Sequence, residues 1–210
     1  MKKIRWKTLI ITCIITVLPM LIGIIFYNQL PEQIPVHFNI YNQPDNYASR
    51  EFALFGIPAI LLAVQIICCI ICDLKRKEEA EVSNVEKVFK WWIPVLSVLV
   101  GILLVEYPLR VRLDIRMYIC ITLGILSLVT GFYFPRMSYD SIKGKMIPLP
   151  KNEKDFNIFT RICGVTFIIF GLAIIISIRF TPIVSAIITI VWAVAMALEP
   201  LYIVIKNRKK

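Results

Sequence analysis

The chain has 210 residues, of which 58% are hydrophobic, and its formal net charge is +10. Soluble globular domains are about half apolar, so this excess favours a protein whose solvent is lipid. The mean hydropathy of +0.75 points the same way. The positive charge is not a sign of a nucleic-acid partner, because its distribution between loops follows the pattern of a membrane protein.

The apolar residues gather into six long blocks that lack the alternation of barrel strands. The blocks are Thr8–Tyr27, Ala53–Cys72, Trp91–Tyr107, Met117–Phe134, Ile162–Ile178 and Ile183–Ile205. A helix needs about 20 apolar residues to cross a bilayer core, with a range of about 17–25. Lipid admits only helices and closed barrels, because backbone polar groups must be paired there. The sequence therefore predicts an all-α membrane protein with six transmembrane helices in one domain, residues 1–210.

The first block follows a basic start, MKKIRWK, as the core of a secretory signal would. A signal core has about 7–15 apolar residues and ends at a small-residue cleavage site. This block is longer and runs into Tyr27-Asn28-Gln29 without such a site. We interpret it as a retained first helix.

The lysines and arginines predict the orientation of the helices. Five of the 24 lie on one set of connecting segments: Arg50, Arg110, Arg112, Arg116 and Arg179. The other nineteen lie on the opposite set, which includes both termini. The positive-inside rule places both termini and the loops 73–90 and 135–161 in the cytoplasm, and the loop 28–52 outside. The same residues favour contact with anionic lipids, and the loop 73–90 has the mixed charges of a solvated surface helix.

The loop 28–52 contains IPVHFNIY, in which apolar and polar residues alternate. This period of two predicts a short half-buried strand. The inward side chains are expected to be Ile34, Val36, Phe38 and Ile40. A turn follows, because Asn42 tolerates positive φ better than most residues, and His37 is expected to fix the loop through a hydrogen bond. The loop is expected to fold over the helix ends, either as a structural lid or as a recognition surface.

The same loop resembles the start of the SdpI family of bacterial membrane proteins. That family has L-P-x-x-I-P-x-H-F-x-x-x-G-x-x-D and a basic residue after its first helix. The pattern is matched here by Leu30, Pro31, Ile34, Pro35, His37, Phe38, Asp45 and Arg50, then by Ala53-Leu54-Phe55 and Pro58-Ala59-Ile60. Asn42 replaces the usual glycine. A looser resemblance covers Gly131, Tyr133, Pro135, Arg136, Gly144, Pro148, Arg161 and Gly164, with departures at Phe132 and Thr160.

The resemblance implies an immunity protein of the bacterial cell membrane that protects its cell from a secreted, membrane-active toxin peptide. It also implies that the toxin-bound protein recruits a small cytoplasmic repressor. The residues expected to contact the toxin are His37, Phe38, Asp45, Arg50, Glu106, Arg110 and Arg112. The expected cytoplasmic partner face consists of Arg136, Lys143, Lys145 and Arg161.

Polar side chains within apolar spans are costly and mark candidate functional positions. Glu106 is expected to pair with Arg110, four residues later, and Gln65 is the main polar residue near a span centre. Glu199, which precedes Pro200 in the last block, either faces the bundle interior or has no special role. The outer cluster of Arg110, Arg112 and Arg116 with Asp114 is expected to contact lipid headgroups or an acidic feature of a peptide.

Catalytic motifs are absent from the sequence: it has no G-x-S-x-G, no H-E-x-x-H, no P-loop and a single histidine. We therefore expect no enzymatic activity, no cofactor and no metal. All six cysteines lie in apolar blocks, and Cys69-x-x-Cys72 is better explained by packing than by redox chemistry. Two other functions stay open, a small transporter component and a sensory membrane anchor whose cytoplasmic loops bind a regulator.

Overall fold

The computed structural model describes residues 4–74, 84–110, 113–139, 150 and 152–208, with side chains described as far as residue 198. Contacts among these residues define two compact units. The N-terminal unit comprises Ile4–Asp73 and Lys90–Thr122. The C-terminal unit comprises Leu123–Lys210 together with Leu74–Phe89.

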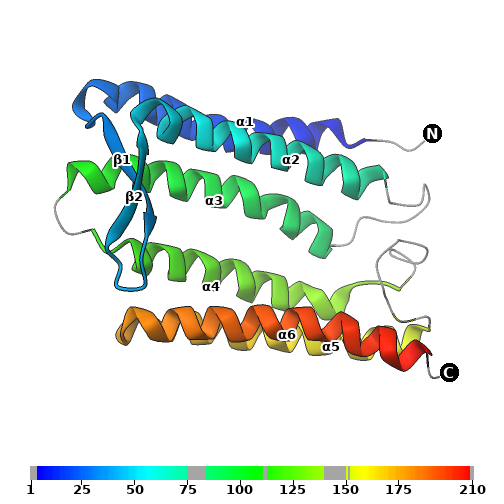
Figure 1. Cartoon of the computed structure of the whole chain (residues 1–210). Helices are drawn as coiled ribbons and strands as arrows, with labels where there is room; N and C mark the ends of the chain where they lie inside the picture. The colour runs from blue at the N-terminus through cyan, green and yellow to red at the C-terminus, as the bar shows by residue number, and fades with distance from the viewer. Residues whose placement is uncertain (1–3, 75–83, 111–112, 140–149, 151, 209–210) are drawn as a thin grey trace. The chain divides into compact units, whose positions relative to one another are not determined.

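Six α-helices and one β-hairpin make up the described chain (Figure 1). The helices are α1 (Trp6–Phe26), α2 (Ile57–Leu74), α3 (Asn84–Leu109), α4 (Ile115–Tyr133), α5 (Glu153–Ile176) and α6 (Pro182–Arg208). The hairpin consists of β1 (Gln33–Phe38) and β2 (Pro44–Ser49), and a π-helical turn, Phe52–Gly56, leads from it into α2. The prediction of six helices is confirmed.

Five helical stretches are long and apolar enough to cross a membrane. They are Trp6–Gln29, Phe52–Leu74, Asn84–Leu109, Ile115–Arg136 and Glu153–Arg179. Over the described side chains, the sixth helix offers only the shorter apolar stretch Pro182–Leu198. The multi-pass membrane character follows from the five long stretches, while the orientation of the helices stays a prediction.

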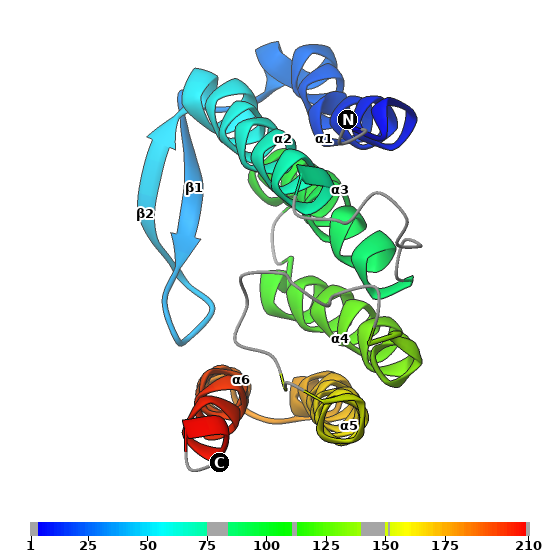
Figure 2. The same ribbon diagram turned by 90° about the vertical axis from the view of Figure 1, so that its right-hand side faces the viewer.

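In the N-terminal unit, α1, α2 and α3 pack side by side (Figure 2). The approach of α1 to α3 is close, because a Cβ added to Gly101 would lie 2.1 Å from the Cβ of Pro19. The Ser97 hydroxyl donates a hydrogen bond at 2.7 Å to the carbonyl of Thr16, three residues before Pro19. A serine from a neighbouring helix thus satisfies backbone near a proline in a span.

The hairpin is antiparallel, with Ile34 opposite Ala48 and His37 opposite Asn46. Asn42 has φ = 61°, so the predicted turn residue adopts the left-handed conformation. The predicted strand is confirmed, with Ile34 fully buried, but Ile40 is wrong as an inward residue because it is 52% exposed. The reason is that β1 ends at Phe38 and Ile40 belongs to the turn.

Two helices begin earlier than the apolar blocks suggest. Helix α3 begins at Asn84, and α5 begins at Glu153 with the Asn152 side chain as its N-cap. The predicted loops 73–90 and 135–161 are therefore too long, and Asp73 and Lys90 lie within helices. Hydropathy marks the lipid-facing part of a helix, whereas the helix itself continues through polar turns. The proposed surface helix falls mainly on residues 75–83, which lie outside the described part.

In the C-terminal unit, paired glycines bring α4 and α5 together. A Cβ on Gly131 would lie 2.7 Å from the Gly164 carbonyl oxygen, and a Cβ on Gly164 would lie 2.9 Å from that of Gly131. Gly124 and Gly171 form a second pair one heptad away, with corresponding distances of 3.0 and 2.9 Å. Small residues at these positions allow the close backbone approach that stabilises helix pairs in lipid. On the other side of α5, the rings of Phe170 and Trp192 stack with centroids 4.4 Å apart.

Candidate functional site

The base of the hairpin is held by Arg50, which follows β2. Its Nη1 donates hydrogen bonds to the carbonyl oxygens of Tyr27 and Leu30, at 3.1 and 2.9 Å. Its guanidinium lies over the Tyr27 ring, 4.1 Å from the centroid, where cation–π attraction adds to the bonds. The Tyr27 hydroxyl in turn donates to the Glu51 carboxylate, and this bond lowers the pKa of Glu51. Arg50 is thus an anchor for the hairpin.

The underside of the hairpin is apolar. Ile34 is fully buried in a cluster with Leu30, Leu54, Leu104 and Val105. These side chains come from the hairpin, from the approach to α2 and from α3, so the strand is fixed to two helix ends. A fully buried isoleucine contributes roughly 1.5–3 kcal/mol relative to an exposed one. The hairpin is therefore part of the core of the N-terminal unit.

Further along β1, Phe38 packs against the Tyr107 ring of α3. The two rings meet edge to face, with centroids 4.9 Å apart. This geometry matches the preference of aromatic pairs and adds roughly 0.5–1.5 kcal/mol beyond simple burial. Phe38, predicted as a toxin contact, therefore lies half-buried and serves the attachment of the hairpin.

The tip of the hairpin is attached to the start of α4. The Asn42 side-chain amide donates to Asp114 Oδ1 at 2.9 Å, and its carbonyl oxygen accepts from the Arg116 backbone N–H at 3.2 Å. Asp114 also accepts from the Met117 backbone N–H, as an N-terminal cap does. One asparagine therefore supplies both the left-handed turn and a tie to a helix distant in sequence.

The outward face of the hairpin carries His37 and Asp45. Their side chains join across the two strands, with His37 Nδ1 2.5 Å from Asp45 Oδ1. The His37 side chain is 65% exposed and that of Asp45 is 41% exposed. The expected loop-fixing hydrogen bond of His37 is confirmed, and its partner Asp45 is another of the predicted contact residues. Tyr41 and Tyr47 are also exposed, so this face is polar and aromatic.

The other predicted outer residues form a local pair rather than part of the hairpin. Arg110 Nε lies 2.7 Å from Glu106 Oε2, which confirms the expected pairing of these two residues within one helical turn. The Arg110 side chain is 68% exposed, so the pair contributes little to stability. Arg112 lies outside the described residues.

A second polar group lies at the opposite end of the same unit and was missed from the sequence. Asp73 of α2 is buried, with its Oδ1 2.7 Å from Lys90 Nζ of α3 and 3.3 Å from Arg5 Nε. Its Oδ2 accepts from the Arg5 backbone N–H at 3.0 Å, just before α1. Buried charges occur in this way when they are paired and hydrogen-bonded. Asp73 thereby links all three helices of the unit.

Gln65, predicted as an intramembrane polar residue, is fully buried and lies on the same face of α2 as Asp73. Its Nε2 donates to the Lys90 carbonyl at 3.0 Å and contacts Cys69 Sγ at 3.2 Å. Positions 65, 69 and 73 are spaced by four, which places them on one helix face. That spacing was the available signal for this cluster, although its partners on α1 and α3 could not be identified from it.

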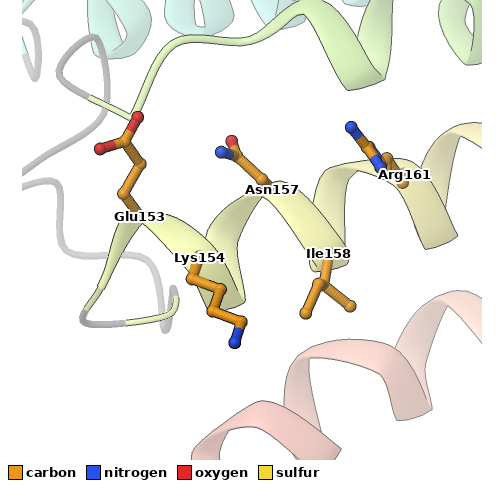
Figure 3. A pocket seen from close by; sticks show the side chains of 5 residues that line it. All are labelled: Glu153, Lys154, Asn157, Ile158 and Arg161. Atoms are coloured by element: carbon orange, nitrogen blue, oxygen red, sulfur yellow. The ribbon is translucent and has the colours of Figure 1, made fainter.

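The predicted cytoplasmic face is described only in part, because Lys143 and Lys145 lie outside the described residues. Arg136 lies over the Phe132 ring, 3.7 Å from the centroid, and donates to the Phe132 carbonyl. Arg161 borders a cavity of about 430 Å³ at the start of α5 (Figure 3). Between Arg136 and Arg161 no hydrogen bond or ion pair occurs within the described part. The side chain of Glu199 also lies outside what is described.

No group of three metal-ligating side chains occurs among the described residues. The six cysteines are free thiols, of which Cys69, Cys120 and Cys163 are buried. The described polar side chains of the site are thus anchors and exposed polar groups.

Residues 14–62 match a family model described as a domain of unknown function, DUF1648. The matched stretch contains most of α1, the whole hairpin and the beginning of α2. It therefore includes Arg50 with both of its carbonyl acceptors, and also the pair of His37 and Asp45. Neither the curated proteins nor the solved structures include a significant match to the chain.

Proposed function

We propose that this chain is an immunity protein of the bacterial cell membrane, in which the hairpin recognises a secreted, membrane-active peptide. The proposal rests first on the resemblance of Leu30–Arg50 and its surroundings to the SdpI family. It rests further on one structural observation: the hairpin is anchored at its base, underside and tip, while its outward face is exposed.

The anchoring favours recognition because an isolated two-stranded hairpin is at best marginally stable in water. Here Arg50, Ile34 and Asn42 hold the strands before any partner arrives. A surface that is already ordered loses less conformational entropy on binding, and its affinity is correspondingly higher. The anchors are buried or partly buried, whereas His37 and Asp45, with the nearby Tyr41 and Tyr47, are exposed and accessible to a partner.

The outward pair has the chemistry to select among peptides. Asp45 accepts hydrogen bonds and attracts cationic side chains, while His37 offers a second ring nitrogen as donor or acceptor. Exposed Tyr41 and Tyr47 add large amphipathic surfaces, which are enriched in binding sites. A short cationic or amphipathic peptide on its way to the membrane fits this combination.

The test is survival of a sensitive bacterium that expresses the full chain and is challenged with a toxin peptide of the kind that SdpI-family proteins resist. We expect survival at peptide concentrations that kill cells with the empty vector, with membrane fractionation to establish that the protein is in place. Death of cells that contain the intact, membrane-localised protein would exclude immunity to that peptide. The sensory anchor and the transporter component would then be the functions to test.

A further inference from the structure

The first turns of α5 border a cavity of about 430 Å³ that the proposed function does not use. Its described lining residues are Glu153, Lys154, Asn157, Ile158 and Arg161. All five belong to the C-terminal unit and to one helix. The cavity therefore combines an acid, two bases, an amide and one aliphatic side chain.

The polar lining residues are arranged in a row. Glu153, Asn157 and Arg161 are spaced by four along the helix and project to the same side of it (Figure 3). At 1.5 Å per residue, the row extends over about 12 Å, with the carboxylate at one end and the guanidinium at the other. Lys154 and Ile158 form the beginning of the adjacent row. The cavity wall is thus polarised along the helix axis.

These charges are available to a ligand. Among the described residues, neither Glu153 nor Arg161 forms an ion pair or a side-chain hydrogen bond, and both are exposed. Asp155 lies on another face of the same turn, and its carboxylate already accepts a hydrogen bond from the Asn152 side-chain amide at 2.9 Å. The two ends of the row are too far apart to neutralise each other directly.

The positive and negative ends of this row lie at different distances from the apolar part of α5. Glu153–Arg179 is one of the stretches that can span a bilayer, and its apolar run begins at Ile162, directly after Arg161. Arg161 therefore lies at the boundary with the hydrocarbon region and Glu153 lies about two turns farther out. In a phospholipid with an amine headgroup, the phosphate likewise lies next to the acyl region and the ammonium lies farther out.

We infer that this cavity binds the headgroup of a phospholipid that carries a primary ammonium, as phosphatidylethanolamine does. Arg161 binds the phosphodiester, for which its planar guanidinium is well suited, and Lys154 adds a second positive charge. Glu153 accepts hydrogen bonds from the ammonium, and the Asn157 side-chain amide donates to a phosphate oxygen. Ile158 covers the apolar part of the headgroup.

The arrangement also determines which headgroups are disfavoured. A purely anionic headgroup such as phosphatidylglycerol has no cation to compensate Glu153. A choline headgroup has a cation but no N–H with which to bond to that carboxylate. This site therefore differs from the general attraction of basic loops to anionic lipids, which depends on charge alone.

The experiment is native mass spectrometry of the full-length protein in detergent, titrated with phosphatidylethanolamine, phosphatidylglycerol and phosphatidylcholine of equal chain length. We expect the ethanolamine lipid to be retained best by the wild type. Arg161→Gln removes a charged hydrogen-bond donor, so its retention of this lipid should be at least about tenfold weaker. Glu153→Gln should lose the preference for ethanolamine over choline while keeping phospholipid binding. Both side chains are exposed, so these variants fold normally.

Arg179→Gln is the matched control, because Arg179 is an exposed arginine just beyond the other end of the same helix. It should leave lipid retention unchanged. Equal retention of the three lipids by the wild type, or equal retention by wild type and Arg161→Gln, would overturn the assignment. A parallel titration with inorganic phosphate distinguishes a lipid phosphate from a free phosphate ion as the bound group. Displacement of the lipid by millimolar phosphate would assign the cavity to a free anion and overturn the lipid site.

Discussion

The carboxylate of Asp73 and the ammonium of Lys90 meet at 2.7 Å, although 17 positions separate the two residues in the sequence. Their side chains are 1% and 2% exposed, so the pair is removed from water. Arg5 completes the cluster with a second contact to Asp73. This small ionic centre joins the three helices that carry the hairpin.

Removal of one charge from this centre should be costly. Lys90→Met removes the cation that lies 2.7 Å from the buried Asp73 carboxylate, and breaking a buried pair typically costs about 3–5 kcal/mol. We expect a clear drop in the thermal unfolding temperature of the detergent-solubilised protein. The control is Lys87→Met, which removes an exposed lysine one turn earlier on α3 and should change that temperature little. An unchanged unfolding temperature in Lys90→Met would contradict a structural role for the pair.

The glycine pairs predict the sensitivity of α4 and α5 to added volume. In Gly131→Ala the new methyl group would lie 2.7 Å from the Gly164 carbonyl oxygen, so the helices must separate. Overpacking of this kind costs about 1–3 kcal/mol. Val129→Leu adds a methylene group on the exposed side of α4 and should be nearly neutral. Equal stability of the two variants, measured by thermal unfolding, would argue against this close packing.

Asn42 has two roles: its backbone adopts the left-handed conformation, and its side chain bonds to the start of α4. Two substitutions separate these roles. Asn42→Gly keeps the favourable left-handed backbone and removes the bonds to Asp114 and Arg116. Asn42→Ala removes the same bonds and also introduces a strain of about 1–2 kcal/mol at φ = 61°. Stability should therefore decrease from wild type to glycine to alanine. Proteolysis of the hairpin tip in detergent measures this order, and an alanine variant as resistant as the wild type would contradict it.

Arg50 should not be replaceable by lysine. Arg50→Lys keeps the charge but loses the planar stacking on Tyr27 and the guanidinium bonds to two carbonyl oxygens. We expect faster amide hydrogen exchange in Gln33–Ser49, by about tenfold or more, because each bond to a charged group contributes about 1.5–3 kcal/mol. Arg110→Lys, which alters only an exposed pair with Glu106, is the control and should leave this exchange unchanged. Similar amide exchange of the hairpin in both variants would contradict the anchoring role of Arg50.

The helices and the strand could be predicted because each depends on local pattern. Continuous apolar blocks identify spans, since lipid forces their backbone into helices, and a period of two identifies a half-buried strand. The starts of α3 and α5 could not be predicted in this way. Their first turns are polar, with residues such as Lys87 and Lys154 at exposed positions, and hydropathy does not distinguish a polar helix from a loop.

The site could be predicted only as a set of residues. His37, Asp45 and Arg50 were identified from the motif, but the hairpin register determines that the first two bond to each other and that the third is an anchor. Likewise, the buried Gln65 was identified, while its neighbours Asp73 and Lys90 were assigned to a loop. Contacts between residues distant in the sequence depend on packing, which no local pattern records.

Recognition of a peptide by the outward face of the hairpin is tested most directly by survival under peptide challenge with that face altered. The variant His37→Ala/Asp45→Ala removes the exposed pair and leaves the anchors Arg50, Ile34 and Asn42 in place. Its control, Asn84→Ala/Lys87→Ala, removes an exposed hydrogen-bonded pair of α3 that lies outside the hairpin and outside the predicted toxin contacts. If the outward face recognises the peptide, wild type and control protect cells equally, and the hairpin variant, present in the membrane at the same level, does not. Full protection by the hairpin variant would contradict recognition through this face.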